Sequence, residues 1–319
     1  MTAPPVLTPT TTTARTRRRV CWQTALTLGV LVAAACLTRR QWPVVVTGAG
    51  RLAVADEGWL LVGAVAALAT WVSAALAQQG AVAERLPSAR LLAAQFAASA
   101  ANHVLPAGLG AGAVNVRFLM RCGLPVGRSA GALAVKATVG AAVRIVLIAG
   151  LAATCPGVLR VPHVPAGVVA VLVAAAMLVA ALPRTRLWPR LRRGSAAVAA
   201  DIRTVHARPS RAAALWGGSL AFAAAHSLVL ICVTQAVELP LSPARVALLY
   251  LAASSAAALL PTPGGIGSLD AALAFALTAS GAPGATAASV VLGYRLLTVW
   301  LPLVPGLLVL GVLIRRKAL

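Results

Sequence analysis

The sequence has few acidic side chains and little charge of any kind. Only six of its 319 residues are Asp or Glu, and charged residues make up 11 % of the chain, whereas an ordinary soluble domain carries about 25 %. Hydrophobic residues make up 60 %. Apolar stretches near the ~20 residues that a helix needs to cross a bilayer recur from Val20 almost to the C-terminus. The sequence therefore predicts a membrane protein with no room for a sizeable soluble domain.

Signatures of catalysis and of metal binding are also missing from the sequence. It contains no paired carboxylates, no G-x-S-x-G, no P-loop and no cluster with metal-ligand spacing. The five cysteines form no C-x-x-C pair and no zinc set with histidine, so we interpret them as small apolar residues. We expect a protein that is not an enzyme and that needs no cofactor or metal.

The excess of basic residues is large, with a formal net charge of +22. Nucleic-acid binding needs basic residues gathered on one water-facing surface, but here arginines sit in short loops beside apolar spans, as the positive-inside rule predicts. The longest basic block, Arg184–Arg211, fits attraction to anionic lipid headgroups on the cytoplasmic leaflet. Nucleic acid is not expected as a partner.

The N-terminal region differs in composition from the rest of the chain. Residues 1–19 are too poor in apolar side chains to fold and predict a disordered basic tail. The apolar run Val20–Leu37 follows; a secretory signal, or a lipoprotein signal ending at Ala33–Cys36, is the alternative to an uncleaved first helix. The many spans downstream favour the uncleaved helix. We expect one polytopic membrane domain over residues 20–314 and a basic cytoplasmic tail over 315–319.

Seven further apolar segments follow the first: Trp59–Gln79, Leu91–Met120, Ser129–Ala152, Ala166–Leu182, Ala212–Val237, Val246–Ser280 and Ala285–Ile314. Two of them contain helix-breaking residues, namely Pro106, Gly108, Gly110 and Gly112 in Leu91–Met120, and Pro261, Pro263, Gly264, Gly265 and Gly267 in Val246–Ser280. Proline removes a helical hydrogen bond and clashes with the preceding turn, while glycine weakens a helix. Each broken segment is therefore expected to form two half-helices around a bend.

The basic loops indicate how the broken segments lie in the membrane. If both segments return to the side that they entered, four basic regions fall together on the cytoplasmic side: Arg15–Arg19, Arg117–Arg128, Arg184–Arg211 and Arg315–Lys317. If each segment crossed instead, the block Arg184–Arg211 would lie outside, against the positive-inside rule. The fold class predicted is an all-α integral membrane protein with about six full transmembrane helices and two re-entrant helical hairpins. We expect a multi-pass protein of the cell (inner) membrane with both termini cytoplasmic.

The order of these segments also predicts an inverted repeat. A span, a broken segment and a span over about 59–152 correspond to the same series over about 212–314, in the opposite orientation. The bends align as Pro106–Gly110 with Pro263–Gly267. Transporters with this architecture form their binding site where broken helices meet near the midplane.

Charged residues inside the apolar spans are the main candidates for a binding site. A charge at a helix centre costs roughly 2.5–3.5 kcal/mol on insertion scales. Lys136, Arg144 and Arg295 outnumber the only acid among them, Asp270, so a bound anion is the natural complement. Half-helix N-termini near the bends would add N–H donors and partial positive charge for a phosphate. The predicted substrate-binding residues are Asn102, Arg117, Lys136, Arg144, Asp270 and Arg295.

Structural roles remain open for several of these residues. Lys136 lies about 10 Å from the start of its span and is able to snorkel to the membrane surface. Arg295 and Asp270 are able to pair purely for structure, and Asn102 to satisfy backbone groups freed by the bend. His226 is interpreted as a packing residue or an interhelical hydrogen-bonding residue.

Three groups of residues carry a resemblance to a known family: Asn102–Gly110 followed by Arg117; Leu260–Gly267 with Asp270; and Gly293–Arg295 with Trp300–Pro302. In these motifs the sequence resembles the lysylphosphatidylglycerol synthetase transmembrane-region family, also described as flippase-like. The likeness extends over roughly Trp59–Ile314. Its most specific part is the stretch Pro-Thr-Pro-Gly-Gly-Ile-Gly.

The resemblance implies a role in lipid handling. In the two-part resistance proteins of that family, the membrane region is associated with moving an aminoacylated phospholipid between leaflets, and a separate cytosolic domain synthesises it. No such synthetase domain is expected here, so the resemblance implies translocation or binding of a lipid without aminoacyl transfer. Asp270 stands where the family more often has Glu, and Lys136 lies in a region where an acid–base pair is expected. These differences leave the lipid open, between phospholipid and polyprenyl-phosphate types.

The leading functional hypothesis is a lipid translocase whose basic intramembrane cavity binds a phosphate-bearing headgroup. One alternative is a non-transporting subunit that presents a lipid to a partner membrane enzyme, such as a glycosyltransferase or synthetase. The other alternative is a small-solute exporter. The oligomeric state stays open.

Overall fold

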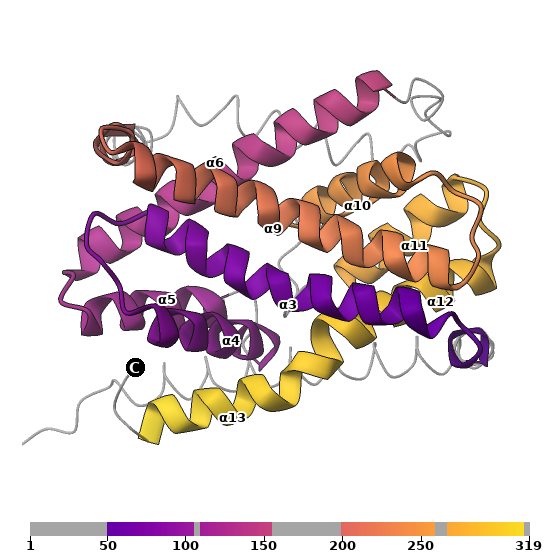
Figure 1. The fold of residues 1–319 in the computed structure, drawn as a ribbon, viewed down its shortest axis with the longest axis horizontal. Helices are drawn as coiled ribbons and strands as arrows, with labels where there is room; N and C mark the ends of the chain where they lie inside the picture. The colour runs from indigo at the N-terminus through magenta and orange to yellow at the C-terminus, as the bar shows by residue number, and fades with distance from the viewer. Residues whose placement is uncertain (1–49, 105–108, 155–198, 259–266, 316–319) are drawn as a thin grey trace, which may run out of the picture.

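The computed structural model describes residues 50–104, 109–154, 199–258 and 267–315. Its helices are α3 Glu57–Gly80, α4 Ser88–Val104, α5 Leu109–Arg121, α6 Val126–Thr154, α9 Pro209–Ala236, α10 Pro243–Ala258, α11 Ser268–Ala279, α12 Gly284–Arg295, the π-helical turn η5 Leu296–Trp300, and α13 Leu301–Arg315. Figure 1 shows them as one layered bundle of helices.

Within these ranges, four helical stretches are long and apolar enough to cross a membrane: Glu57–Gly80, Val126–Thr154, Pro209–Ala236 and Gly284–Leu313. The prediction of an all-α, multi-pass membrane protein is confirmed. The expected spans Val20–Leu37 and Ala166–Leu182 lie outside the described residues, as do both terminal tails, so the helix total stays a prediction.

An antiparallel pair, α3 and α9, forms the centre of the bundle. Asp56 begins α3: its Oδ1 accepts from the Trp59 N–H at 3.0 Å, and its own N–H donates to the carbonyl of Ala236 at the end of α9. At the other end of the pair, a Cβ on Gly218 would lie only 2.5 Å from the Ala77 nitrogen. Small residues therefore allow the two backbones to approach closely, as in many membrane helix pairs.

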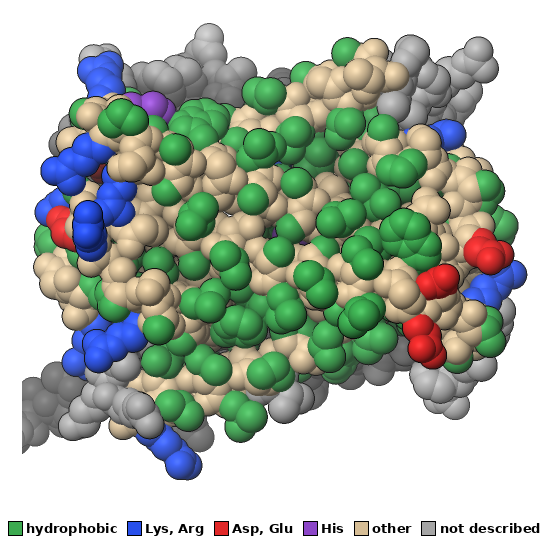
Figure 2. Space-filling model, in the orientation of Figure 1, with side chains coloured by type: hydrophobic (Ala, Val, Ile, Leu, Met, Phe, Trp, Pro, Cys, Tyr) green, Lys and Arg blue, Asp and Glu red, His purple; other side chains and the backbone are tan. Residues whose placement is uncertain are grey.

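The outward face of this pair is apolar. On α3, large exposed side chains recur at Leu61, Val65, Leu68, Val72 and Leu76, which is the spacing of one helix face. Figure 2 shows hydrophobic side chains spread over the middle of the face that α3, α9 and α13 present, with charged side chains at its two ends. Such a surface suits contact with lipid chains rather than with water.

Each broken segment consists of two short helices, as the proline and glycine pattern predicts. Helix α4 packs along α5, and α10 packs along α11. The bends expected over 105–108 and 259–266, with Pro106, Gly108, Pro261, Pro263, Gly264 and Gly265, lie outside the described residues. The second half-helices begin at Leu109 and Ser268, beside Gly110 and Gly267 as expected.

Gly110 and Gly267, which flank the expected bends, are needed for different structural reasons. A Cβ on Gly110 would lie 2.1 Å from the carbonyl oxygen of Ala101, so this glycine allows α5 to touch the end of α4. Gly267 has a φ of +89°, a left-handed conformation that favours glycine. Asp270 Oδ2 accepts from the Gly267 N–H at 3.0 Å and caps the start of α11.

The last span differs from the uninterrupted helix that its sequence suggests. It passes from α12 into the π-helical turn η5 immediately after Arg295 and continues as α13, which contains Pro305. π-Helical turns are rare and are frequent at functional sites. Here the turn lies next to the buried ion pair described below.

Contacts between helices come in matching pairs. Helix α3 contacts α4 as α9 contacts α10, and α5 contacts α6 as α11 contacts α12. Helix α13 packs on α4, and α6 packs on α10. The α4–α5 and α10–α11 pairs lie toward opposite ends of the bundle in Figure 1.

The two ends of the molecule differ in charge. Figure 2 shows Lys and Arg gathered at the end where α3 and α5 finish and α6 and α9 begin. The opposite end carries the acidic residues Asp56 and Glu57, before and in the first turn of α3, and Glu238 just after α9. We call the first the basic end.

Candidate functional site

A cavity of about 760 Å³ lies between α3, α4, α5, α6, α9, α10 and η5. Most of its wall is small or apolar. Its polar lining residues are Thr70, Gln95, Ser99, Asn102, Asn115, Lys136, Arg144, Ser219, His226, Ser255 and Thr298. Among the described residues of this lining, two are cations and none is a carboxylate. The cavity is therefore electropositive, and both of its cations were candidates from the sequence.

Lys136 is held inside the bundle by acceptors from two other helices. Its Nζ donates to the carbonyl oxygen of Ala74 at 3.0 Å, to Gln78 Oε1 at 3.3 Å and to Gln95 Oε1 at 3.5 Å. The ammonium therefore has acceptors within the helix bundle, while snorkelling of Lys136 to the membrane surface stays a prediction.

Neutral amides surround this ammonium. Gln95 Nε2 donates to Asn115 Oδ1 at 2.9 Å, and Asn115 Nδ2 donates to the Ala111 carbonyl at 2.9 Å. Gln78 is 0 % exposed, and its Nε2 has no hydrogen-bond partner. Sequence reasoning missed all three amides. The available signal was their presence in apolar segments, where polar side chains commonly bond across helices.

Arg144 lies eight residues beyond Lys136 on α6, or about 12 Å along the helix axis at 1.5 Å per residue. Its NH1 donates to Ser254 Oγ at 3.4 Å, on α10. Lys136 therefore faces the first hairpin through Gln95, and Arg144 faces the second. One helix presents a cation to each.

His226 joins three helices at the cavity wall. Its Nδ1 lies 3.0 Å from the hydroxyl of Tyr294, which donates to the Tyr250 hydroxyl at 3.3 Å. The His226 ring also stacks on Tyr250, with ring centroids 5.9 Å apart and planes inclined by 14°. The interpretation of His226 as an interhelical hydrogen-bonding residue is confirmed. The two tyrosine partners were not predicted.

Asp270 and Arg295 form an ion pair with each other. Arg295 Nε donates to Asp270 Oδ1, while the other carboxylate oxygen caps α11 at Gly267. Arg295 is only 8 % exposed. Neither residue is part of the cavity lining. The pairing expected as the structural alternative is present, and it leaves Lys136 and Arg144 as the cations of the cavity.

The remaining two candidates, Asn102 and Arg117, differ in their position relative to the cavity. Asn102, in the last turn of α4, lines the cavity. Arg117 is exposed on α5 and does not line it. The structure thus brings together Asn102, Lys136 and Arg144, and it places Arg117, Asp270 and Arg295 outside the lining.

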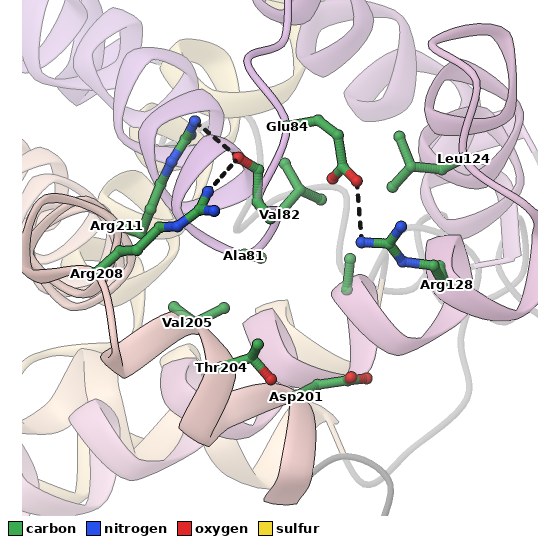
Figure 3. Close-up of a pocket in the computed structure, with 12 residues that line it drawn as sticks. Ala81, Val82, Glu84, Leu124, Arg128, Asp201, Thr204, Val205, Arg208 and Arg211 are labelled. Carbon is green, nitrogen blue, oxygen red and sulfur yellow. Dashed lines mark hydrogen bonds and ion pairs between the residues drawn. The ribbon is translucent and has the colours of Figure 1, made fainter.

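A second, smaller cavity of about 140 Å³ lies at the basic end. Figure 3 shows Arg208 and Arg211 on one side of it. Both donate to the carbonyl oxygen of Ala83, at 3.3 and 3.2 Å. On the other side Arg128 pairs with Glu84 at 2.9 Å. These guanidinium groups tie α9 and α6 to the loop that follows α3, so acceptors of the chain itself engage them.

Over residues 50–104, 109–154, 199–258 and 267–315, no group of three or more His, Cys, Asp or Glu side chains is arranged to hold a metal ion. The chemistry that the central cavity offers is that of two cations, neutral amides and hydroxyls. This set suits the binding of an anion with polar substituents.

Comparison with known proteins supports the family suggested by the sequence motifs. No individual curated protein matches the chain. A family model described as the lysylphosphatidylglycerol synthase TM region matches residues 22–306. This range includes both broken segments and every residue that lines the central cavity. Because the match covers most of the chain, the protein belongs to the lysylphosphatidylglycerol synthase transmembrane-region family.

Proposed function

We propose that this protein is a lipid translocase that accepts a phosphate-bearing anionic headgroup in the central cavity while the lipid tails stay in the bilayer. One observation carries the proposal: Lys136 and Arg144 line a cavity inside the membrane domain, and its described lining contains no carboxylate to neutralise them.

The energetic argument concerns the cost of these two charges. A Lys or Arg at a helix centre costs roughly 2.5–3.5 kcal/mol on insertion scales, so such residues mark binding sites or pathways. In this protein Lys136 contacts neutral acceptors and Arg144 contacts a hydroxyl. A phosphate would supply the missing negative charge. Guanidinium binds phosphate with two parallel hydrogen bonds, which favours Arg144 as the principal phosphate ligand.

The dimensions of the cavity support a headgroup as its occupant. Ligand sites typically enclose about 300–1,000 Å³ and have mostly apolar walls with a few polar groups. The cavity here, at about 760 Å³, has that size and composition. A headgroup fits this volume. The acyl or prenyl chains stay outside the cavity, because the apolar bilayer beside the protein accommodates them.

The paired helix contacts support an inverted repeat of transporter type. The antiparallel α3–α9 pair and the equivalent contacts of the two hairpins are those expected for two halves related by a pseudo-twofold axis. In the proposed topology both hairpins are re-entrant, from opposite sides of the membrane. The basic end lies on the cytoplasmic side of the cell (inner) membrane, because Lys and Arg concentrate in cytoplasmic loops.

The family name also points toward membrane lipid, since it refers to the transmembrane part of a synthase of lysylphosphatidylglycerol. We propose movement of a lipid rather than its synthesis for this chain. Cations, neutral amides and hydroxyls are suited to binding an anion. Binding of this kind does not require a covalent bond to be made or broken.

Transbilayer movement of acyl-labelled phosphatidylglycerol in proteoliposomes tests the proposal. The protein is expected to accelerate exchange between leaflets, and Arg144→Ala to slow it at least about tenfold, since losing a charge-assisted hydrogen bond costs about 1.5–3 kcal/mol. Arg90→Ala is the matched control. Arg90 is exposed in the first turn of α4 and lines neither cavity.

Three outcomes contradict translocation. Equal exchange with and without protein, across phospholipid and polyprenyl-phosphate substrates, removes it. Saturable lipid binding without exchange replaces it with the lipid-presenting subunit of a partner membrane enzyme. Uptake of a water-soluble phosphate ester without lipid movement indicates the small-solute exporter.

A further inference from the structure

The two cations of the central cavity differ in one chemical property. The ammonium of Lys136 is able to release a proton, whereas the guanidinium of Arg144 stays charged in proteins. We propose that Lys136 is a proton site coupled to the anion: it releases a proton when no anion is near and takes one up when the headgroup binds. One proton then accompanies each headgroup across the membrane. This inference rests on the proposed function and names the ion whose gradient drives it.

Neutral oxygen atoms are the described hydrogen-bond partners of Lys136. Its Nζ donates to the Ala74 carbonyl and to Gln78 Oε1, both on α3, and to Gln95 Oε1 on α4. The two salt bridges between described residues do not include Lys136. A charge inside the bundle without a counter-charge is costly. Lysine avoids this cost by releasing a proton.

Arg144 adds electrostatic repulsion to this cost. It lies on the same helix as Lys136, about 12 Å further along, and its described hydrogen bond goes to the neutral Ser254 hydroxyl. Two charges of the same sign disfavour each other, most strongly away from water. Because Arg144 keeps its charge, Lys136 is the residue that changes. An anion between them cancels the repulsion and favours the return of the proton.

The hydrogen bonds of Lys136 allow this change without movement of the backbone. An ammonium donates three hydrogen bonds, and a neutral amine keeps two N–H groups and a lone pair. The bonds to Ala74 at 3.0 Å and Gln78 at 3.3 Å persist, and the amine gives up the longest bond, to Gln95 at 3.5 Å. One N–H bond breaks, its electron pair stays on Nζ and the proton passes to water. Gln95 lines the central cavity, so the proton leaves on that side.

The other titratable groups around Lys136 come from α9 and from the basic end. Helices α3, α4 and α5 contribute only neutral side chains to the described lining of the central cavity, and α9 contributes His226. The test must therefore separate Lys136 from His226. The charged residues that line the smaller cavity are Glu84, Arg128, Asp201, Arg208 and Arg211.

The smaller cavity brings the basic end close to Lys136. Ala132 lines that cavity, while Leu133, the next residue, lines the central one. Ala132 precedes Lys136 by four residues, which is about one helical turn or 6 Å along α6. Figure 3 shows carboxylates, Glu84 and Asp201, around the smaller cavity. A polar cavity on each side of Lys136 is what exchange of a proton with either side of the membrane requires.

The test uses proteoliposomes that contain acyl-labelled phosphatidylglycerol and a pH gradient of one unit. Proton binding and anion binding favour each other by the same factor. The wild-type protein is therefore expected to shift the lipid between leaflets in the direction of the proton gradient. The limit is about tenfold, the proton ratio across one pH unit, when one proton moves with each lipid. A pH-sensitive dye inside the vesicles reports the accompanying proton flux.

Lys136→Arg is the diagnostic variant, because arginine keeps the positive charge and does not release a proton. It is expected to exchange lipid without responding to the pH gradient. Lys136→Met, which removes the charge at similar length, is expected to lose the response as well. His226→Asn is expected to keep it. The control is His206→Asn, because His206 is an exposed histidine that lines neither cavity.

The outcomes separate this inference from the proposed function. Intact exchange by the wild-type protein with an unchanged leaflet ratio and no proton flux overturns the proton site. A normal response in Lys136→Arg, or loss of the response only in His226→Asn, overturns it as well. If the wild-type protein exchanges no lipid at all, the proposed translocation fails.

Binding in detergent then decides the proton site without transport. Calorimetry of short-chain phosphatidylglycerol in two buffers of different ionisation enthalpy measures the protons taken up on binding. Uptake by the wild-type protein that is absent from Lys136→Arg supports the site. Binding of the lipid without proton uptake overturns it.

Discussion

The two helical hairpins of this molecule manage charge in opposite ways. The α10–α11 hairpin supplies its own acid, Asp270, which neutralises Arg295 and caps α11 in one arrangement. The α4–α5 hairpin offers Lys136 only neutral oxygen atoms, from Gln95 and its neighbours. The Asp270–Arg295 pair therefore neutralises itself, whereas the described hydrogen bonds of Lys136 and Arg144 all go to neutral groups. Under the proposed function, a negatively charged ligand supplies the missing charge at these two cations and has nothing to neutralise at the Asp270–Arg295 pair.

The largest expected effect is on the Asp270–Arg295 ion pair. Arg295→Ala leaves the Asp270 carboxylate without its partner, and breaking a buried ion pair costs about 3–5 kcal/mol; the partial exposure of Asp270 places the expected loss at the lower end. Thermal unfolding of the protein in detergent measures it. The double variant Asp270→Asn with Arg295→Met is expected to recover most of the loss. A single variant as stable as wild type, with lipid exchange abolished, would instead return Arg295 to a direct role in substrate binding.

A smaller effect is expected where the first hairpin closes. Gly110→Ala places a Cβ 2.1 Å from the Ala101 carbonyl oxygen, which belongs to the backbone and cannot move away easily. Overpacking of this kind costs typically about 1–3 kcal/mol. Gly112→Ala, two residues later on the same helix, meets no atom within 4 Å and is the matched control. Equal melting temperatures for the two variants would show that α4 and α5 do not pack as closely as described.

The smallest effect is expected where α12 contacts α9 and α10. Tyr294→Phe removes the hydroxyl that joins His226 to Tyr250, and a buried hydrogen bond contributes about 1 kcal/mol. Chemical or thermal unfolding in detergent measures this change. Tyr250→Phe keeps the His226–Tyr294 bond and is expected to cost less. A larger loss of stability for Tyr250→Phe than for Tyr294→Phe would show that Tyr294 makes its stronger contact with Tyr250.

Much of the fold follows from residues that break or forbid regular structure. Clustered proline and glycine predict the interruption of two segments, because these residues cannot continue a helix without cost. The starts of α5 and α11 lie beside the expected glycines. The π-helical turn after Arg295 was not predicted, because its five residues include no proline or glycine and packing against neighbouring helices decides their hydrogen-bond register.

The charged residues of the candidate site were predictable from the sequence. The neutral residues that separate helices bring together were not. Lys136 and Arg144 stand out in an apolar sequence, and both line the cavity. Gln78, Gln95 and Asn115 come from three separate helices; a neutral amide in an apolar segment is a signal, but it does not tell which helices the amide joins. Arg117 shows the opposite error: its position after the first bend suggested the cavity, but its direction on α5 places it outside.

The sequence by itself determined that this chain enters a membrane, where its helices break, and that its interior holds more positive than negative charge. These properties follow from composition and from the local chemistry of proline, glycine and ionisable side chains. The tertiary structure alone decided which cation Asp270 neutralises and which two remain at the cavity. The reason is distance: electrostatic attraction and hydrogen bonding act over a few ångströms between atoms that helix packing brings together from distant parts of the chain.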